Sequence, residues 1–302
     1  MAILKYRLRW NELKSLRRTT LFMPGNNPGM LQNAAILGAD SIILDLEDAV
    51  SLTEKDSARI LVKEAIKNVD YTTVETIVRV NPLDSGFCYD DLEVIVRIKP
   101  DTLLIPKANE EQIVEVDKII TRIEQEEGFE AGGIKLIALV ETAFGLETIY
   151  DTIKASKRIN GVLLGGEDLT SDMGVKRTKE GEEIFYARNR VATACKAAKI
   201  SSIDTPFTDT EDVEGLERDT AKAKSLGLTG KAVINPRQID VIHNVFAPTD
   251  AEIEYALKVL EARDEAFRSG KGVFSLNGKM VDAPVINRAE TTVELARILC
   301  LI

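Results

Sequence analysis

The chain is poor in the residues on which several classes of catalytic and metal site depend. It contains one histidine and three cysteines among 302 residues. This composition excludes histidine-rich metal sites, cysteine-based zinc sites and a disulfide framework. The lone His243 lies in a helical segment beyond the last strand-like run, which favours a surface or packing role and excludes a serine or cysteine triad. The cysteines, Cys88, Cys195 and Cys300, are far apart and indicate a reducing, cytoplasmic location.

Long hydrophobic runs and an excess of positive charge are also missing. No apolar run approaches the roughly 20 residues needed to cross a bilayer, so we expect a soluble protein without a membrane partner. The formal net charge of −10 argues against a nucleic-acid partner. Residues 1–18 depart from this balance and form a basic arm. This arm is either a solubilising tail or a contact for an anionic ligand, and Arg18, next to the first predicted strand, is the substrate-binding candidate within it.

Short apolar runs rich in β-branched residues recur along the chain with helix-length spacers between them. They occupy residues 19–25, 41–48, 76–81, 102–107, 135–141, 161–168, 201–207 and 230–236. Such runs are typical of parallel strands buried on both faces, and strand–helix alternation requires right-handed crossovers. Eight units predict a (β/α)8 TIM barrel over residues 19–248, in which catalytic residues follow the strands.

Helical periodicity between the strands supports this architecture. Ile113, Val116, Ile120 and Ile123 share one face of a predicted outer helix that ends at a glycine. Residues 249–302 follow the eighth unit and begin with an amphipathic helix over residues 249–267. A turn at Asn277-Gly278 and a second helical pattern come next. We therefore expect a C-terminal helical extension and lid segment that packs away from its own barrel.

Two carboxylates end successive predicted strands. Glu141 ends the fifth run and Asp168 the sixth, so both are expected side by side on the rim of the barrel. In a site without histidine or cysteine, paired carboxylates suit a hard cation such as Mg²⁺. The alternative is that one or both cap the helix that follows.

Charged residues also end the second and third runs. Arg79 lies in an otherwise apolar strand, so its guanidinium must be paired or face a ligand. Asp45 and Glu47 alternate onto one side of the second strand, where they are available to pair with Arg79 or to hold metal-bound water. We assign Arg79 and Glu47 to the catalytic group, and both roles of Arg79, ion pair and ligand contact, remain open.

Two weaker signals complete the predicted rim. Pro24 and Gly25 open a loop whose backbone amides are able to approach a ligand. Lys107 ends the fourth run, either as a Schiff-base nucleophile or as an electrostatic partner of the rim carboxylates, and we favour the second role because negative neighbours keep an amine protonated.

Several motifs, in this order, resemble one enzyme family. RRTTLFMPGNNPGM, ILDLEDAV, VRVNP, LIPKA, ALVETAFGL, GGEDLTSDMG, GKAVINPRQI and the C-terminal GKMVDAP are similar to the citrate lyase β subunits of the HpcH/HpaI aldolase superfamily, which also includes malyl-CoA and citramalyl-CoA lyases. The resemblance covers essentially the full length. It implies that Glu141 and Asp168 bind Mg²⁺, that Arg79 and Glu141 bind substrate, and that Asp282 in KMVDAP reaches a neighbouring subunit's site as the general base or as the base's orienting partner. The alternative for Asp282 is a turn-forming residue before Ala-Pro.

The implied activity is the Mg²⁺-dependent cleavage of a citryl thioester to oxaloacetate and an acetyl thioester. The thioester is expected on coenzyme A or on an acyl carrier protein whose prosthetic group derives from dephospho-CoA. The resemblance implies the α and γ (acyl carrier) subunits of citrate lyase as partners, and a homo-oligomer, with a trimer as one option, or a larger complex. A stand-alone malyl-CoA or citramalyl-CoA lyase and a non-catalytic subunit that organises the carrier are the alternatives.

Overall fold

The chain divides into a barrel unit and a C-terminal unit. The computed structural model describes residues 16–268, 274–276 and 278–302. The barrel unit is Leu16–His243, and Asn244–Ile302 belongs to the C-terminal unit. Apart from residues 16–18, the predicted basic arm lies outside the described residues.

All eight predicted runs form strands, and the predicted (β/α)8 barrel is confirmed. The strands are β1 (Thr19–Pro24), β2 (Ser41–Asp45), β3 (Glu75–Arg79), β4 (Thr102–Ile105), β5 (Lys135–Val140), β6 (Ile159–Leu164), β7 (Ser201–Asp204) and β8 (Gly230–Val233). They pair in sequence order, all parallel, and β8 closes the barrel against β1. Each strand ends before its predicted run does, so several polar residues expected at strand ends lie in the loops that follow.

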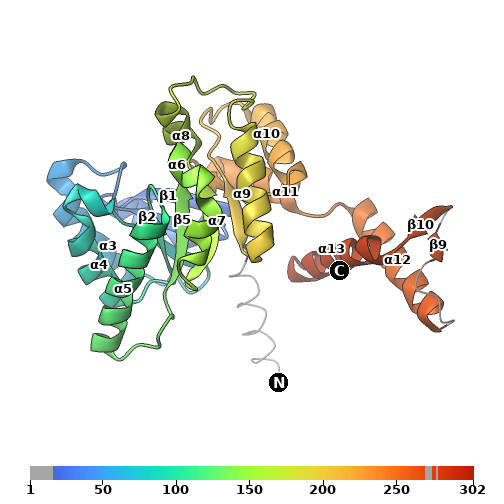
Figure 1. The fold of residues 1–302 in the computed structure, drawn as a ribbon, viewed down its shortest axis with the longest axis horizontal. Coiled ribbons are helices and arrows are strands. Elements are labelled where there is room, and N and C mark those ends of the chain that lie inside the picture. The colour runs from blue at the N-terminus through green and yellow to red at the C-terminus, as the bar shows by residue number, and fades with distance from the viewer. Residues whose placement is uncertain (1–15, 269–273, 277) are drawn as a thin grey trace. The chain divides into compact units, whose positions relative to one another are not determined.

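Helices follow the strands and cover the outside of the barrel (Figure 1). They are α2 (Pro28–Asn33), α3 (Lys55–Asn68), α4 (Cys88–Ile95), α5 (Glu110–Glu127), α6 (Ala143–Glu147), α7 (Ile149–Lys154), α8 (Gly166–Asp172), α9 (Phe185–Ala198), α10 (Val213–Ser225) and α11 (Ile239–Phe246). Short 3₁₀ turns are η1 (Ala34–Ile36), η2 (Leu52–Glu54), η3 (Leu83–Ser85), η4 (Val96–Ile98) and η5 (Pro236–Gln238). In α5 the predicted apolar face is buried, and Gly128 ends the helix with a positive φ of 68°.

Alternate residues of the strands fill the barrel interior. The buried cluster there consists of Ile43, Ile77, Leu104, Ile137, Leu139, Leu163, Ile203 and Ala232. Because strand side chains alternate between faces, the residue two positions after each of these points inward again, one layer nearer the C-terminal mouth. This period of two decides which side chains reach the site.

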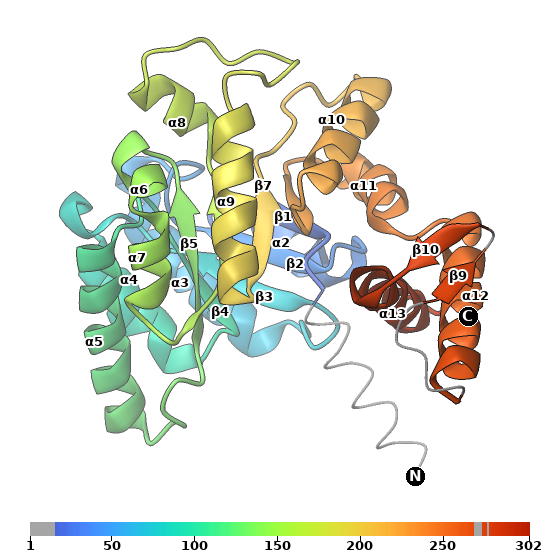
Figure 2. The same cartoon turned by 45° about the vertical axis from the view of Figure 1, so that its right-hand side comes forward.

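The C-terminal unit has a core of its own. It consists of α12 (Asp250–Arg268), an antiparallel hairpin of β9 (Phe274–Leu276) and β10 (Lys279–Val281), and α13 (Ala283–Ile298). The two helices pack on each other and on the hairpin (Figure 2). Val259, Val281 and Val293 belong to its buried cluster. The predicted helix at residues 249–267 is confirmed, and the predicted turn includes Asn277, which lies outside the described residues.

Two of the three cysteines, Cys88 and Cys195, are buried. Burial raises the pKa of both thiols to about 12. None of the described helices is long and apolar enough to cross a membrane.

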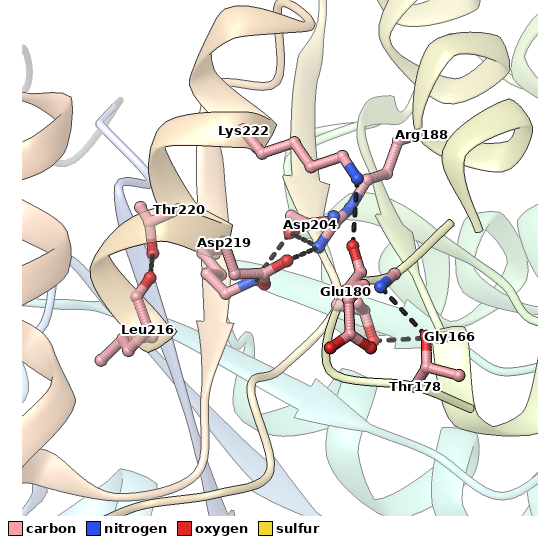
Figure 3. Close-up of polar contacts among 12 residues, drawn as sticks. Gly166, Thr178, Glu180, Arg188, Asp204, Leu216, Asp219, Thr220 and Lys222 are labelled. Carbon is pink, nitrogen blue, oxygen red and sulfur yellow. Dashed lines mark hydrogen bonds and ion pairs between the residues drawn. The ribbon is translucent and has the colours of Figure 1, made fainter. Parts of the chain in front are cut away.

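Four charged side chains form a closed ion-pair cluster between the barrel wall and its outer helices. Arg188 donates to Asp204 (2.9 and 2.8 Å) and to Asp219 (2.7 Å) (Figure 3). Lys231 Nζ lies 2.6 Å from a carboxylate oxygen of each aspartate. Burial opposes the charge of Asp219, but Lys231 and Arg188 outweigh it and hold the pKa of Asp219 below its ordinary value. Two cations thus balance two anions in a site almost closed to water.

Removing one member of this cluster is expected to destabilise the barrel. Arg188→Met leaves two buried carboxylates with one cation, at a cost of about 3–5 kcal/mol in the free energy of unfolding. Arg218→Met on α10 is the matched control, since the Arg218 side chain is 70% exposed and exposed ion pairs contribute at most about 1 kcal/mol. Urea unfolding followed by circular dichroism measures both. Equal midpoints for the two variants would contradict the stabilising role of the cluster.

The single histidine packs at the N-terminal end of β1. His243 Nε2 lies 2.8 Å from Thr19 Oγ1 and 3.4 Å from Asp40 Oδ1. Burial lowers the pKa of His243 below its ordinary 6.5, although Asp40 opposes this shift. The folded state therefore favours the neutral ring.

This depressed pKa predicts a stability loss in mild acid. As the pH falls below 6.5, His243 of the unfolded chain takes up a proton before His243 of the folded chain does. The free energy of unfolding therefore decreases as the pH falls from 6.5 to the lower pKa of the folded state. Because the chain has one histidine, its C2-proton NMR signal reports this pKa directly. A His243→Gln variant should lose less stability than the parent between about pH 6.5 and pH 5. A measured pKa above 6.5 would refute the prediction.

Candidate active site

A cavity opens at the C-terminal mouth of the barrel. Its volume is about 380 Å³, which suits a small-molecule ligand. The described lining residues are Phe22, Asp45, Asp48, Ala49, Arg79, Leu139, Glu141, Leu163, Gly165, Gly166, Glu167, Asp168, Thr205, Pro206 and Ile234. Most of the polar ones near the barrel axis lie two residues beyond a core residue. Arg79 is the one cation in this described lining, which carries five carboxylates.

Arg79 and Asp45 form the central ion pair of the cavity. Arg79 Nε and Nη2 donate to the two Asp45 oxygens at 2.7 Å each, in bidentate geometry. The Phe22 ring lies 5.1 Å from the guanidinium carbon. Both charged groups are buried, so Arg79 is fixed in position. Of the two predicted roles of Arg79, the ion pair is confirmed.

Asp45 also holds the loop that follows β2. Its oxygens accept the backbone N–H groups of Glu47 (2.9 Å) and Ala49 (3.1 Å). Buried Lys55 Nζ donates to the carbonyl oxygens of Leu46 (2.8 Å) and Glu47 (2.6 Å). The backbone that presents Glu47 is therefore held from both sides.

Glu47 has one oxygen without a hydrogen-bond donor. Arg79 Nη1 lies 2.7 Å from Glu47 Oε2, but this contact lacks hydrogen-bond geometry. Burial raises the pKa of Glu47 to about 7; Arg79 opposes the shift, and Asp48, Asp45 and Asp168 add to it. A buried carboxylate oxygen without a donor is suited to accept a proton or a ligand hydrogen bond.

Glu141 follows β5 directly and is buried. Its Oε1 accepts the Lys107 backbone N–H at 2.7 Å. Lys107 adopts a left-handed φ of 48°, uncommon for a residue with a side chain. A Cβ at Gly165 would lie 2.6 Å from Glu141 Cβ and 2.9 Å from Oε2, so glycine is needed there. Burial raises the pKa of Glu141 to about 8, with Glu47 and Asp168 adding to the shift and the Lys107 N–H opposing it.

Asp168 reaches the same cavity from a helix. It lies in the first turn of α8 and is exposed, whereas the sequence predicted it at the end of β6. The start of this helix is fixed, because the Gly166 N–H donates to Thr205 Oγ1 at 3.0 Å and a Cβ at Gly166 would lie 2.8 Å from that oxygen. Glu141 and Asp168 therefore line one cavity from neighbouring barrel units.

The donor set fits a hard cation that takes few protein ligands. Within the described residues, no group of three or more histidine, cysteine, aspartate or glutamate side chains is arranged to hold a metal. Mg²⁺ commonly uses one or two carboxylates together with water and substrate oxygens. The missing Cβ at Gly165 leaves room beside Glu141 Oε2, and Glu47, which the described lining does not include, has an Oε2 that is ion-paired with Arg79 without a hydrogen bond. These features suit Mg²⁺ and do not suit a zinc site.

Several predicted site residues lie elsewhere. Arg18 is at the N-terminal end of β1, where it pairs with Asp40 at 2.8 Å. The Gly25 N–H donates to the Asp45 carbonyl oxygen at 2.8 Å and is not available to a ligand, and Pro24 ends β1 outside the cavity lining. Lys107 contributes its backbone N–H, while its side chain is exposed.

Asp282 lies in the C-terminal unit as the N-cap of α13. Its side chain accepts the Val285 N–H at 3.3 Å. In this structure Asp282 thus caps a helix of the C-terminal unit.

Sequence reasoning missed two polar residues that the structure places at or behind the site: Lys55 as a support of the β2 loop, and Thr205 in the cavity wall. The period of two in the strands carried a signal for Thr205, since it lies two residues beyond the core residue Ile203. No sequence signal pointed to Lys55.

An eight-stranded parallel barrel with an acidic cavity at its C-terminal mouth defines a TIM-barrel enzyme suited to a divalent cation. The family model of HpcH/HpaI aldolase/citrate lyase matches residues 18–236. The chain belongs to this family.

Known relatives cover nearly the whole chain. Citrate lyase subunit beta of Haemophilus influenzae is 46% identical over 283 residues, which are 93% of this chain and 97% of that protein. Mitochondrial citramalyl-CoA lyase of Homo sapiens is 32% identical, covering 93% of this chain and 85% of that one. A crystal structure of the protein CitE from Mycobacterium tuberculosis, in complex with magnesium, acetoacetate and coenzyme A, has a TM-score of 0.78 at 29% identity and covers 94% and 99% of the two chains.

Proposed function

We propose that the chain is a Mg²⁺-dependent carbon–carbon lyase that cleaves a citryl thioester to oxaloacetate and an acetyl thioester. The observation that carries this proposal is the convergence of Glu141, Asp168 and Arg79 on one cavity. The higher identity to a citrate lyase β subunit than to a citramalyl-CoA lyase supports the citryl substrate.

Glu141 and Asp168 would hold Mg²⁺ in this proposal. When bound, the ion supplies positive charge that lowers the pKa of a coordinated hydroxyl group. The acidic lining gives a second reason for a cation. A substrate with two carboxylates meets five lining carboxylates and one arginine, so like-charge repulsion opposes binding without a divalent ion.

Arg79 would stabilise negative charge on the thioester oxygen. The substrate hydroxyl loses its proton, the oxygen forms the ketone of oxaloacetate, and the broken C–C bond leaves its electron pair on the acetyl thioester as an enolate. Protonation of that enolate completes the balance. Because Asp45 fixes Arg79 before substrate arrives, little reorganisation is needed when the charge develops.

The general base is assigned to Asp282 from a neighbouring subunit, with Glu47 as the second candidate. Glu47 Oε2 is ion-paired with Arg79 but accepts no hydrogen bond, and the pKa of Glu47 is raised to about 7, near the value that suits a base at neutral pH. Asp282 requires an oligomer in which the C-terminal unit completes another chain's site. The activity would then depend on assembly.

The thioester carrier and the subunit partners belong to the same proposal. Coenzyme A is supported by a related CitE structure that contains it, and the name of the Haemophilus protein supports assembly with further citrate lyase subunits, including an acyl carrier. A stand-alone lyase for citramalyl-CoA is the second candidate, favoured by the relative of that name. Assaying the purified chain against citryl-, citramalyl- and malyl-CoA separates these activities.

Removing either proposed metal ligand should abolish cleavage without unfolding the protein. Glu141→Gln and Asp168→Asn keep side-chain shape and remove charge, so kcat/KM for citryl-CoA should fall at least about 100-fold. Glu214→Gln is the control, since that side chain is 88% exposed. Calorimetric Mg²⁺ titration, without substrate, should show binding by the parent and the control and none by either variant.

Near-normal activity with unchanged Mg²⁺ dependence in either variant would reject the metal assignment. EDTA should also stop turnover. Activity that resists EDTA, together with a borohydride-trapped oxaloacetate adduct at Lys107, would instead establish Schiff-base chemistry.

A mixing experiment tests Asp282. Asp282→Asn should reduce kcat about 10²–10⁴-fold if this carboxylate is the base. Mixing that variant with an Arg79→Ala chain should restore activity, because some sites in hybrid oligomers then contain both intact residues. Subunit exchange is verified separately with tagged chains. If exchange occurs and the mixture stays inactive, the shared site is disproved; if Asp282→Asn alone is fully active, the base is to be sought at Glu47.

A further inference from the structure

Thr205 is a buried hydroxyl in the wall of the cavity. It directly follows β7 and lies two residues beyond Ile203 of the barrel core, so its side chain points inward at the mouth. The residue is 0% exposed to solvent and lines the cavity beside Gly166 and Pro206. Its bond to the Gly166 N–H starts the helix that carries Asp168, but among the described residues it bonds directly to neither proposed metal ligand nor to Arg79.

The Thr205 hydroxyl accepts one hydrogen bond and still has its own hydrogen to donate. Its oxygen accepts the Gly166 N–H at 3.0 Å, which fixes the orientation of the side chain. A hydroxyl also carries one hydrogen to donate. Among the residues that the structure describes, no acceptor is paired with the Thr205 hydroxyl hydrogen. A buried donor in a cavity wall that lacks a protein acceptor is suited to a ligand oxygen.

The cavity needs such a donor if the substrate is a citryl thioester. Citryl, citramalyl and malyl thioesters share one carboxylate beside the hydroxyl and differ in the third substituent, which is carboxymethyl, methyl or hydrogen. In the described lining the only cation is Arg79, and Asp45 already occupies its Nε and Nη2. The second carboxylate of a citryl group therefore needs a hydrogen-bond donor that is not a lysine or arginine of this lining.

We propose that the Thr205 hydroxyl donates a hydrogen bond to the carboxymethyl group of the substrate and thereby selects citryl over citramalyl and malyl thioesters. This inference rests on the proposed lyase function. A hydrogen bond to a charged group is worth about 1.5–3 kcal/mol, which corresponds to about a 10- to 150-fold preference.

The test compares Thr205→Val with Thr205→Ser. Valine keeps the shape and removes the hydroxyl, whereas serine keeps the hydroxyl. Thr205→Val should lower kcat/KM for citryl-CoA about 10- to 150-fold. Its inhibition constant for oxaloacetate should rise, whereas its inhibition constant for pyruvate should stay within about threefold of the parent's. Oxaloacetate retains the carboxymethyl group and pyruvate has the methyl group in its place. Thr205→Ser should retain the parent's preference for oxaloacetate.

Other outcomes separate the two proposals. If Thr205→Val weakens oxaloacetate and pyruvate equally, Thr205 acts only through Gly166, and the specificity role is overturned. If Thr205→Val does not fold, by circular dichroism, Thr205→Ala provides the same comparison. A parent protein that cleaves citramalyl-CoA and not citryl-CoA defeats the proposed function before any variant is made. Full citryl-CoA activity in Thr205→Val defeats the inference alone.

Discussion

The Asp45–Arg79 pair is the interaction on which the geometry of the site depends. It joins two adjacent barrel strands through two hydrogen bonds of 2.7 Å, and the same carboxylate accepts two backbone N–H groups of the loop after β2. One buried aspartate therefore sets the position of the guanidinium and the path of the loop that carries Glu47. Its two oxygens have four protein donors, which leaves it little capacity for a ligand. Asp45 supports the chemistry by orienting Arg79, and the carboxylates that face a ligand are Glu141 and Asp168.

Fixing Arg79 in this way has an electrostatic consequence. Arg79 lowers the pKa of Glu47 and of Glu141, but burial and the neighbouring carboxylates outweigh it at both residues. Burial accordingly raises the pKa of Glu47 to about 7 and that of Glu141 to about 8. Lys107 adds one backbone N–H toward Glu141 at the cost of a left-handed backbone. Such strain and crowding of like charge are typical of a functional site.

The barrel and its ligand candidates follow from the sequence because strand patterning and residue alternation are local properties. Apolar runs located all eight strands, and charge inside such a run identified Arg79 and Glu141. Asp168 was placed on a strand because its run, GVLLGGED, shows no break where the helix starts; the contact that starts α8 there, Gly166 to Thr205, joins residues far apart in sequence. Arg18 and Gly25 are likewise held by tertiary contacts, with Asp40 and with the Asp45 carbonyl oxygen, and neither is in the described cavity lining. The alternation of strand side chains predicts that Thr205 points inward, but it was missed because a single uncharged threonine does not stand out in the sequence.

Two groups of charged residues in this barrel differ in their balance of positive and negative charge, and the difference distinguishes a stabilising role from a binding role. Outside the barrel wall, Arg188 and Lys231 balance Asp204 and Asp219, and each carboxylate is paired with both cations. Inside the mouth, the described lining has five carboxylates and one arginine. Asp48, Glu167 and Asp168 of this lining are exposed, whereas Asp45 and Glu141 are buried, and a buried carboxylate without a paired cation costs free energy. A divalent cation bound at the mouth, together with a substrate that coordinates this ion, is the simplest means of neutralising the excess of carboxylates there.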